Sequence, residues 1–456
     1  MINYFKQNSG RGREVLQLAL PVLAEQVFIT LMGVVNAMMA GHIGKEAAAA
    51  IGMIDTLNNI FISAFSSLAV GATVVVAHYT GQSNHRFAGE ASKQALYAGL
   101  TVSSLIAVAV GAFRQPLMGI LFGSAENSVL RLAFEYLAIS LFTYPLIALT
   151  AISCGVLRGA GDTRTPAQVV IIMNVVNVIA GYILIFGLTP LGFDGFGVSG
   201  AALAIGIARL SGVVLLLYVL VRGTLNLKLQ KVFKFKPNLE MLAAIFKIGI
   251  PASLESFLFN SGKLITQTFI VASGTVAIVT NYVGMSLHSL MMTPGLAFSL
   301  AATALVGQNM GRGDSQEAEK SLMYLDKLTV CCLMAVNIIF LPFYSFFCSL
   351  YTSNAEIIKQ TTLLLQVTII FVPFWPMAFL WPAGLKGAGD VRYTLIVSAI
   401  SMWVFRITLG YVLCIYFKLG VLGIWFGMYT DWIIRGIAFL VRLKRGKWKN
   451  NIVVKK

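Results

Sequence analysis

Long apolar runs, bounded by charged residues or by Gly and Pro, constrain this chain more than any other feature of its sequence. The clearest run extends from Thr165 to Phe193, 29 residues without one charged side chain. A helix needs about 20 apolar residues to cross a bilayer. The runs predict twelve membrane helices, at residues 15–39, 47–80, 91–112, 129–156, 165–188, 198–221, 244–272, 279–310, 317–342, 357–385, 391–416 and 421–441.

Composition agrees with this pattern and excludes two classes of protein. Charged residues make up 11% of the chain, against roughly 25% in a typical soluble domain. Hydrophobic residues make up 57% of it. A soluble globular protein and a disordered chain are both excluded. The predicted fold class is therefore an all-α polytopic membrane protein.

The net charge of +16 indicates how the chain is oriented in the membrane rather than a nucleic-acid partner. Cytoplasmic loops of membrane proteins collect Lys and Arg. With the N-terminus inside, 24 of the 34 basic residues fall on the inner side and 5 on the outer side. This division predicts a plasma-membrane protein with both termini in the cytoplasm. The tail from Arg442 onward has seven basic residues and no acidic one, so we expect it to contact anionic membrane lipids.

An internal repeat divides the chain in two. The segment Arg158-Gly-Ala-Gly-Asp-Thr-Arg, predicted to form a tight turn, recurs 228 residues later from Lys386. Pro21 recurs as Pro251. Because each half holds six helices, both halves enter the membrane in the same direction, as in parallel-repeat transporters. The predicted parts are an N-lobe at 1–221, a basic cytoplasmic linker at 222–243, a C-lobe at 244–441 and a basic cytoplasmic tail at 442–456.

Two parallel six-helix halves predict transport by alternating access, with the substrate bound near the middle of the membrane. Three sets of segments resemble the corresponding segments of the multidrug and toxic compound extrusion (MATE) family. They are the helix-one segments Leu20–Leu23 and Met38–Gly44, the paired Gly-Ala-Gly-Asp turns, and the start of helix six at Gly197–Ala202. The resemblance implies twelve helices in two lobes. It also implies an antiporter, not an enzyme, that exports organic cations and amphipathic drugs in exchange for sodium ions or protons.

The chain departs from the family pattern at two positions in its first half. Many members carry Asp in helix one where this chain has Asn36. Many also carry Asp one turn after an Asn of helix five, where Asn177 is followed here by Gly181. The usual cation site of the N-lobe therefore lacks both carboxylates.

Charged residues inside predicted membrane helices are the candidates for ion coupling, because each costs roughly 2.5–3.5 kcal/mol at a helix centre. Glu25 and Glu255 occupy equivalent repeat positions, each four residues after a proline. Either carboxylate could bind a proton or sodium ion or attract a cationic substrate. The structural alternative is a cap on backbone freed by the proline, or a bridge between helices. Asp55 lies beside Asn58 and Asn59 in helix two, where it either faces the same cavity or makes a polar contact between helices.

The second half holds further polar candidates. Arg406 and Asp431 lie on successive helices, with Arg435 one turn after Asp431. They predict a buried ion pair or triad, which either holds the C-lobe together or acts as a switch. His288 is a candidate proton relay, because histidine titrates near physiological pH. Its alternative is a satisfied polar contact.

Amides and tryptophans complete the candidate set. Asn174 and Asn177, together with Asn36, could offer amide oxygens to a cation, although hydrogen bonds between helices are the preferred interpretation. Trp375 and Trp381 lie in helix ten among three prolines. They could stack on aromatic cations, or anchor the helix at the membrane interface.

The predicted partners are therefore small organic cations and membrane lipids, without nucleic acid or an obligatory protein partner. The expected coupling ion is a proton or sodium, and the sequence suggests no cofactor and no metal site beyond a possible sodium site. Three alternatives stay open. A lipid-linked precursor flippase of the same superfamily would need a more cationic cavity for phosphate. A membrane enzyme would need clustered His, Asp or Glu residues at a helix end, and a non-transporting membrane protein would have no evident use for duplicated lobes.

Overall fold

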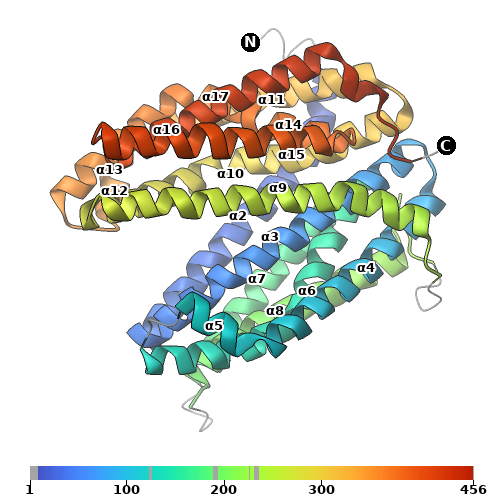
Figure 1. The fold of residues 1–456 in the computed structure, drawn as a ribbon. Coiled ribbons are helices and arrows are strands. Elements are labelled where there is room, and N and C mark those ends of the chain that lie inside the picture. Colours follow the sequence, from blue (N-terminus) through green and yellow to red (C-terminus); the bar gives the residue numbers. More distant parts are fainter. Residues whose placement is uncertain (1–8, 123–125, 188–193, 225, 231–235, 455–456) are drawn as a thin grey trace. The chain divides into compact units, whose positions relative to one another are not determined.

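The computed structural model describes residues 9–122, 126–187, 194–224, 226–230 and 236–454, and its regular elements there are all helical (Figure 1). Twelve helical segments are long and apolar enough to cross a membrane. This finding confirms the predicted all-α polytopic fold. The spans are Val15–Ile43, Lys45–Gly81, His85–Ala112, Asn127–Gly159, Arg164–Phe186, Gly197–Arg222, Leu239–Ala272, Thr275–Arg312, Ser315–Ser349, Ala355–Gly387, Val391–Tyr416 and Val421–Arg445.

The first six spans are nearly continuous α-helices. A short helix, α5 (Arg114–Phe122), follows the third span. The spans themselves are α2 (Ser9–Ile43), α3 (Lys45–Gly81), α4 (His85–Ala112), α6 (Asn127–Gly159), α7 (Arg164–Phe186) and α8 (Gly197–Arg222).

The later spans are more interrupted. Pro373 lies in a 3-10 turn, η3 (Val372–Phe374), which divides span ten as its three prolines predict. Span eleven contains two π-helical segments, η4 (Ser401–Ile407) and η5 (Val412–Tyr416). The elements are α9 (Leu239–Ala272), α10 (Thr275–Arg312), α11 (Ser315–Phe340), η2 (Leu341–Phe343), α12 (Tyr344–Ser349), α13 (Ala355–Phe371), α14 (Trp375–Gly387), α15 (Val391–Ile400), α16 (Thr408–Tyr411), α17 (Val421–Arg445) and η6 (Lys447–Asn450).

Contacts along the chain group it into two compact units. Unit 1 contains the described residues up to Leu23 and those from Leu254 onward, and unit 2 is Ala24–Ser253. Helices α2 and α9 therefore each contribute to both units. The lobe boundaries expected from the repeat, 1–221 and 244–441, stay a prediction.

The linker and the tail, where they are described, bind to the helices of their own unit. Asn226 donates from its side chain to the Ala160 carbonyl, and Gln94 donates to the Lys236 carbonyl, both in unit 2. In unit 1 the indole of Trp448 is fully buried, and the Lys449 amine pairs with Glu319. Part of the basic tail is therefore engaged by protein, and its contact with lipid stays a prediction.

Glycines allow two helix pairs to approach closely at repeat-related positions. A Cβ atom added at Gly159 would lie 2.5 Å from the backbone oxygen of Thr73. One added at Gly387 would lie 2.5 Å from the backbone oxygen of Thr303. Small residues at such crossings let membrane helices pack backbone to backbone, so the same contact is used once in each half.

We expect Gly387→Ala to lower the free energy of unfolding by about 1–3 kcal/mol, because the added methyl group meets backbone that cannot move aside cheaply. Alanine's better helix propensity offsets only about 1 kcal/mol of this loss. The unfolding midpoint in detergent micelles measures the effect. Gly33→Ala is the matched control, because nothing lies within 4 Å of its added Cβ. Equal midpoints for Gly387→Ala and the parent would contradict the close crossing.

Candidate substrate and ion sites

Glu25 on α2 is buried in unit 2 and holds a charged partner. Nη1 of Arg158, at the end of α6, donates to its Oε1 atom over 2.7 Å. The glutamate is 3% exposed. Its second oxygen, Oε2, is buried and has no hydrogen-bond partner among the described residues. The carboxylate is therefore paired on one oxygen and open on the other.

Glu255 on α9, the repeat equivalent in unit 1, is bonded on both oxygens. The Lys386 amine lies 3.0 Å from Oε2. The Thr394 hydroxyl also donates to Oε2 over 3.2 Å, and the Ser398 hydroxyl donates to Oε1 over 3.1 Å. Each glutamate thus pairs with its own basic residue, at an equivalent position of the repeat. They differ in their hydrogen bonds: Glu255 is bonded on both oxygens and Glu25 on one, among the described residues.

Arg158 and Lys386 each open one of the paired Gly-Ala-Gly-Asp turns. The bridge between helices, which the sequence analysis held as an alternative for the two glutamates, is therefore present in both halves. This pairing was not predicted, because both cations lie beside cytoplasmic loops and were interpreted as loop charges. The signal was available, because the glutamates and the turns recur at nearly the same offset.

The two turns share one backbone geometry, as predicted. In each, the third residue of the motif, Gly161 or Gly389, has a positive φ, which favours glycine. Asp162 then accepts from the Thr165 backbone N–H in the first turn of α7 over 3.0 Å. Asp390 instead accepts two bonds from the Arg442 guanidinium, at 2.6 and 2.9 Å. The second turn therefore also holds the end of α17.

Asp55 lies in a polar contact between helices α3 and α6. Its Oδ1 atom accepts from the Tyr136 hydroxyl over 3.3 Å and from the Asn58 amide over 3.5 Å. Asn58 in turn accepts from the Tyr144 hydroxyl over 3.0 Å. These bonds match the structural alternative for Asp55.

The amides of the first half bond to protein. Asn177 on α7 donates to Oδ1 of Asn36 on α2 over 2.6 Å, which is the bond between helices that the sequence favoured. Asn174 donates to the Val170 carbonyl of its own helix. Gly181 packs against the side chain of Met39. The cavity beside Asn36 holds only about 10 Å³, about the space of one water.

A much larger cavity, of about 720 Å³, lies within unit 1 among α9, α10, α14, η4 and α17. This volume falls in the range of small-molecule sites. Aromatic rings and methionines form a large part of its lining beside polar side chains, and Trp375 stacks on Phe379 with ring centroids 4.8 Å apart. Trp375 is therefore placed at this cavity. Trp381 is not: it packs in a separate apolar cluster with Leu322 and Leu385.

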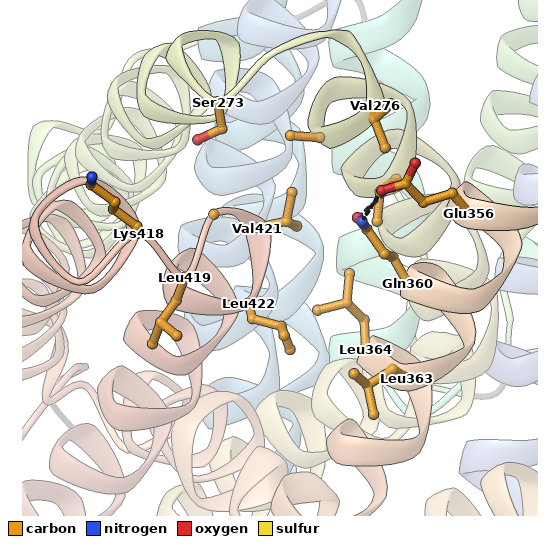
Figure 2. Close-up of a pocket in the computed structure, with 13 residues that line it drawn as sticks. Ser273, Val276, Glu356, Gln360, Leu363, Leu364, Lys418, Leu419, Val421 and Leu422 are labelled. Atoms are coloured by element: carbon orange, nitrogen blue, oxygen red, sulfur yellow. Dashed lines mark hydrogen bonds between the residues drawn. The ribbon is translucent and has the colours of Figure 1, made fainter.

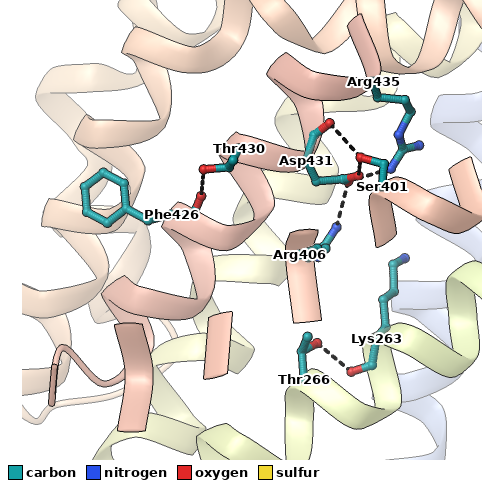
Figure 3. A network of polar contacts seen from close by, with 8 residues as sticks. All are labelled: Lys263, Thr266, Ser401, Arg406, Phe426, Thr430, Asp431 and Arg435. Atoms are coloured by element: carbon teal, nitrogen blue, oxygen red, sulfur yellow. Dashed lines mark hydrogen bonds and ion pairs between the residues drawn. The ribbon is translucent and has the colours of Figure 1, made fainter. Parts of the chain in front are cut away.

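The predicted triad of Arg406, Asp431 and Arg435 is present and buried (Figure 3). Asp431 Oδ2 lies 2.5 Å from Nη2 of Arg435 and 3.8 Å from Nη1 of Arg406. The Ser401 hydroxyl also donates to Asp431. Ser401 and Arg406 lie in the π-helical segment η4, a rare geometry that is frequent at functional sites.

His288 on α10 lines the same cavity but shows no relay chain. Its ring stacks on Trp432 with centroids 5.7 Å apart and meets the edge of Trp425 at 5.8 Å. Its Nδ1 atom is buried without a hydrogen-bond partner in the described part of the chain. The structure thus places His288 in an aromatic wall, and its role as a relay stays a prediction.

A second cavity of unit 1, of about 370 Å³, lies where α9 ends and where α10, α13 and α17 begin (Figure 2). Its polar lining includes Glu356, Gln360 and Lys418. The Gln360 amide donates to Glu356 over 3.1 Å. None of these residues stands out in the sequence, because polar groups near helix ends are ordinary.

Known proteins resemble this chain over nearly its whole length. The MatE family model matches residues 21–183 and again 251–412, which are the two repeats. The chain is 28% identical over 442 residues to a protein of Thermotoga maritima named probable multidrug resistance protein NorM, covering 97% of this chain and 94% of that protein. It is 26% identical over 451 residues to the uncharacterized transporter YisQ of Bacillus subtilis, covering 99% and 97%.

Solved structures share the fold. The crystal structure of MATE in complex with MaL6 aligns with a TM-score of 0.87, covers 97% of this chain and 98% of its own, and is 22% identical. At this identity the likeness concerns the fold alone. It agrees with twelve helices arranged as two repeats.

Proposed function

Because this chain belongs to the MatE family, and is thus a multi-pass membrane transporter rather than an enzyme, we propose that it exports amphipathic organic compounds by alternating access. Protons or sodium ions moving inward drive the cycle. The observation that carries this proposal is the 720 Å³ cavity among the membrane helices of unit 1, with its aromatic and methionine lining. Such a lining suits compounds of varied shape, and the printed name of the Thermotoga relative supports drug export.

Two features of the sequence support the direction and the cycle. The repeat supports two bundles that rock about a common axis, with the same helix order in each. The division of basic residues, 24 against 5, supports cytoplasmic termini in a plasma membrane. Export is then movement from the side of the termini to the opposite side.

Glu25 is the proposed coupling group. Its Oε2 atom has no hydrogen-bond partner in the described segments and offers a place for a proton or a sodium ion. An ion bound there would weaken the pair with Arg158. Glu255 offers no such atom, because both of its oxygens are bonded. We therefore propose ion coupling at Glu25 and a structural role for Glu255.

Organic cations were the substrates that the family resemblance implied, and the membrane carboxylates could attract them. Glu25, Glu255 and Asp431 are each already paired with Arg or Lys, so these carboxylates lend little support to a preference for cations. A lipid-linked precursor flippase is the second candidate, favoured by Lys263 and Arg406 on the cavity wall. The cavity volume fits a drug-sized compound better than a long lipid chain.

Efflux from proteoliposomes tests the proposal. Purified full-length protein is reconstituted with an anionic dye, fluorescein, or a cationic one, rhodamine 123, under an imposed proton or sodium gradient. We expect at least one dye to leave the parent vesicles faster under one gradient than without it. Protein-free vesicles are the control. If neither gradient accelerates either dye in folded parent protein, the antiporter proposal is wrong.

A further inference from the structure

The cavity of unit 1 carries an excess of positive charge. Lys263 on α9 and Arg406 on η4 line it directly. Arg435 lies against the rings of Phe259 and Phe379, which also line it. Asp431 is the one carboxylate that pairs with these cations among the described residues. In Figure 3 the amine of Lys263 points from α9 toward the triad.

All three cations have bonding capacity that the described protein does not use. Arg406 is 3% exposed, and over the described ranges it donates no hydrogen bond; its contact with Asp431 is a 3.8 Å ion pair. Its Nε atom and that of Arg435 are both buried without a hydrogen-bond partner among the residues that the structure describes. No ion pair of Lys263 is found within the described segments either. Buried donors without acceptors are costly, so an acceptor group in the cavity would be favoured beside the buried Arg406. Lys263 is exposed and can pair with the same group.

The aromatic ring nearest these cations already makes cation–π contacts with them. Lys263, Arg435 and Arg406 lie 4.8, 5.2 and 5.6 Å from the centroid of the Phe259 ring. A cationic substrate would compete with them for this ring and would meet like charges at short range. The ring of Trp375 and the side chains of Met292 and Met428 remain as apolar lining.

We propose that this cavity binds an amphipathic organic anion, with its carboxylate or sulfonate at Lys263 and Arg406 and its ring-bearing body against Trp375 and the methionines. The inference rests on the proposed transport function, whose substrate class it names. It replaces the organic cation expected from the sequence with a compound of opposite charge. The positive groups of the site act by binding and orienting this anion.

Equilibrium binding to the detergent-solubilised full-length protein, without any gradient, tests the substrate class separately from transport. Fluorescein and rhodamine 123 share a xanthene core and differ in charge, and fluorescence polarisation reports both. We expect the parent to bind fluorescein more tightly. Lys263→Met should weaken fluorescein binding by about 10- to 100-fold, the range for losing one charged contact, and leave rhodamine 123 no weaker. Lys263→Glu should reverse the preference.

Lys418→Met, which removes a lysine from the second cavity, is the matched control and should leave both affinities unchanged. Because Lys263 is exposed and unpaired in the described structure, its variants are expected to fold, and a monodisperse elution profile checks this. Tighter binding of rhodamine 123 by the parent would overturn the inference. An unchanged fluorescein affinity in Lys263→Met would also overturn it. So would a competition experiment in which undecaprenyl phosphate displaces fluorescein at a lower concentration than unlabelled benzoate-type anions do. Anion binding without gradient-driven efflux would leave the inference standing and refute the proposed function.

Discussion

Replacing Asp431 with alanine is expected to lower the free energy of unfolding by about 3–5 kcal/mol, the cost of leaving buried charges without their partner. Asp431 is fully buried and is the counter-charge of both Arg406 and Arg435. Without it two guanidinium groups remain inside the helix bundle of unit 1. The Ser401 hydroxyl also loses its side-chain acceptor and keeps only the main-chain oxygen of residue 431. The unfolding midpoint in detergent micelles, followed by tryptophan fluorescence, measures the loss.

An exposed ion pair supplies the control for this result. Arg131 and Glu135 on α6 lie 3.5 Å apart, with side chains 82% and 44% exposed. Exposed pairs contribute about 0–1 kcal/mol, so Glu135→Ala should leave the midpoint almost unchanged. If the Asp431→Ala and Glu135→Ala proteins have the same unfolding midpoint, the triad does not stabilise the bundle. Its alternative role as a switch then gains support.

Replacing Glu25 with glutamine is expected to abolish ion-coupled transport, while Glu255→Gln retains a large part of it. Glutamine keeps an acceptor oxygen for Arg158 but has no charge to bind a proton or a sodium ion. Glu25 has one oxygen without a hydrogen-bond partner among the described residues. In Glu255, Lys386 and Thr394 bond to Oε2 and Ser398 bonds to Oε1. Gradient-dependent dye efflux from proteoliposomes measures the difference.

Glu25→Asp is the matched variant, because it keeps the carboxylate and shortens the side chain by one methylene. It should retain dependence on the ion gradient. Equal loss in Glu25→Gln and Glu255→Gln, with both proteins folded, would mean that the open oxygen of Glu25 has no special role.

The architecture was predictable because it depends on properties that a single sequence carries. Apolar length predicts each span, and the recurrence of Arg158 to Arg164 from Lys386 predicts the repeat. The break at Pro373 follows from the missing backbone donor of proline. The triad was predictable because opposite charges on successive apolar helices stabilise each other by pairing. These are local patterns or copies of one pattern.

The site was less predictable because it depends on which distant side chains meet. Glu25 and Arg158 are far apart in sequence, and no spacing rule joins them. The π-helical turn that carries Arg406 toward the cavity has no clear signature in Ser401–Ile407. The candidate carboxylates suggested a cationic substrate, whereas packing pairs Glu25, Glu255 and Asp431 with basic residues. It leaves Lys263 without an ion pair in the described part of the chain. The net charge of the cavity could therefore be determined only from the structure.

Ion movement driven by substrate tests the central claim most directly. Parent protein is reconstituted without any ion gradient, and fluorescein or rhodamine 123 is added on one side. A pH electrode follows protons in weakly buffered medium, and radioactive sodium follows sodium ions. Antiport predicts that one of these ions moves opposite to the transported dye in parent vesicles and does not move in Glu25→Gln vesicles. Dye that crosses through folded parent protein without moving either ion would contradict the account.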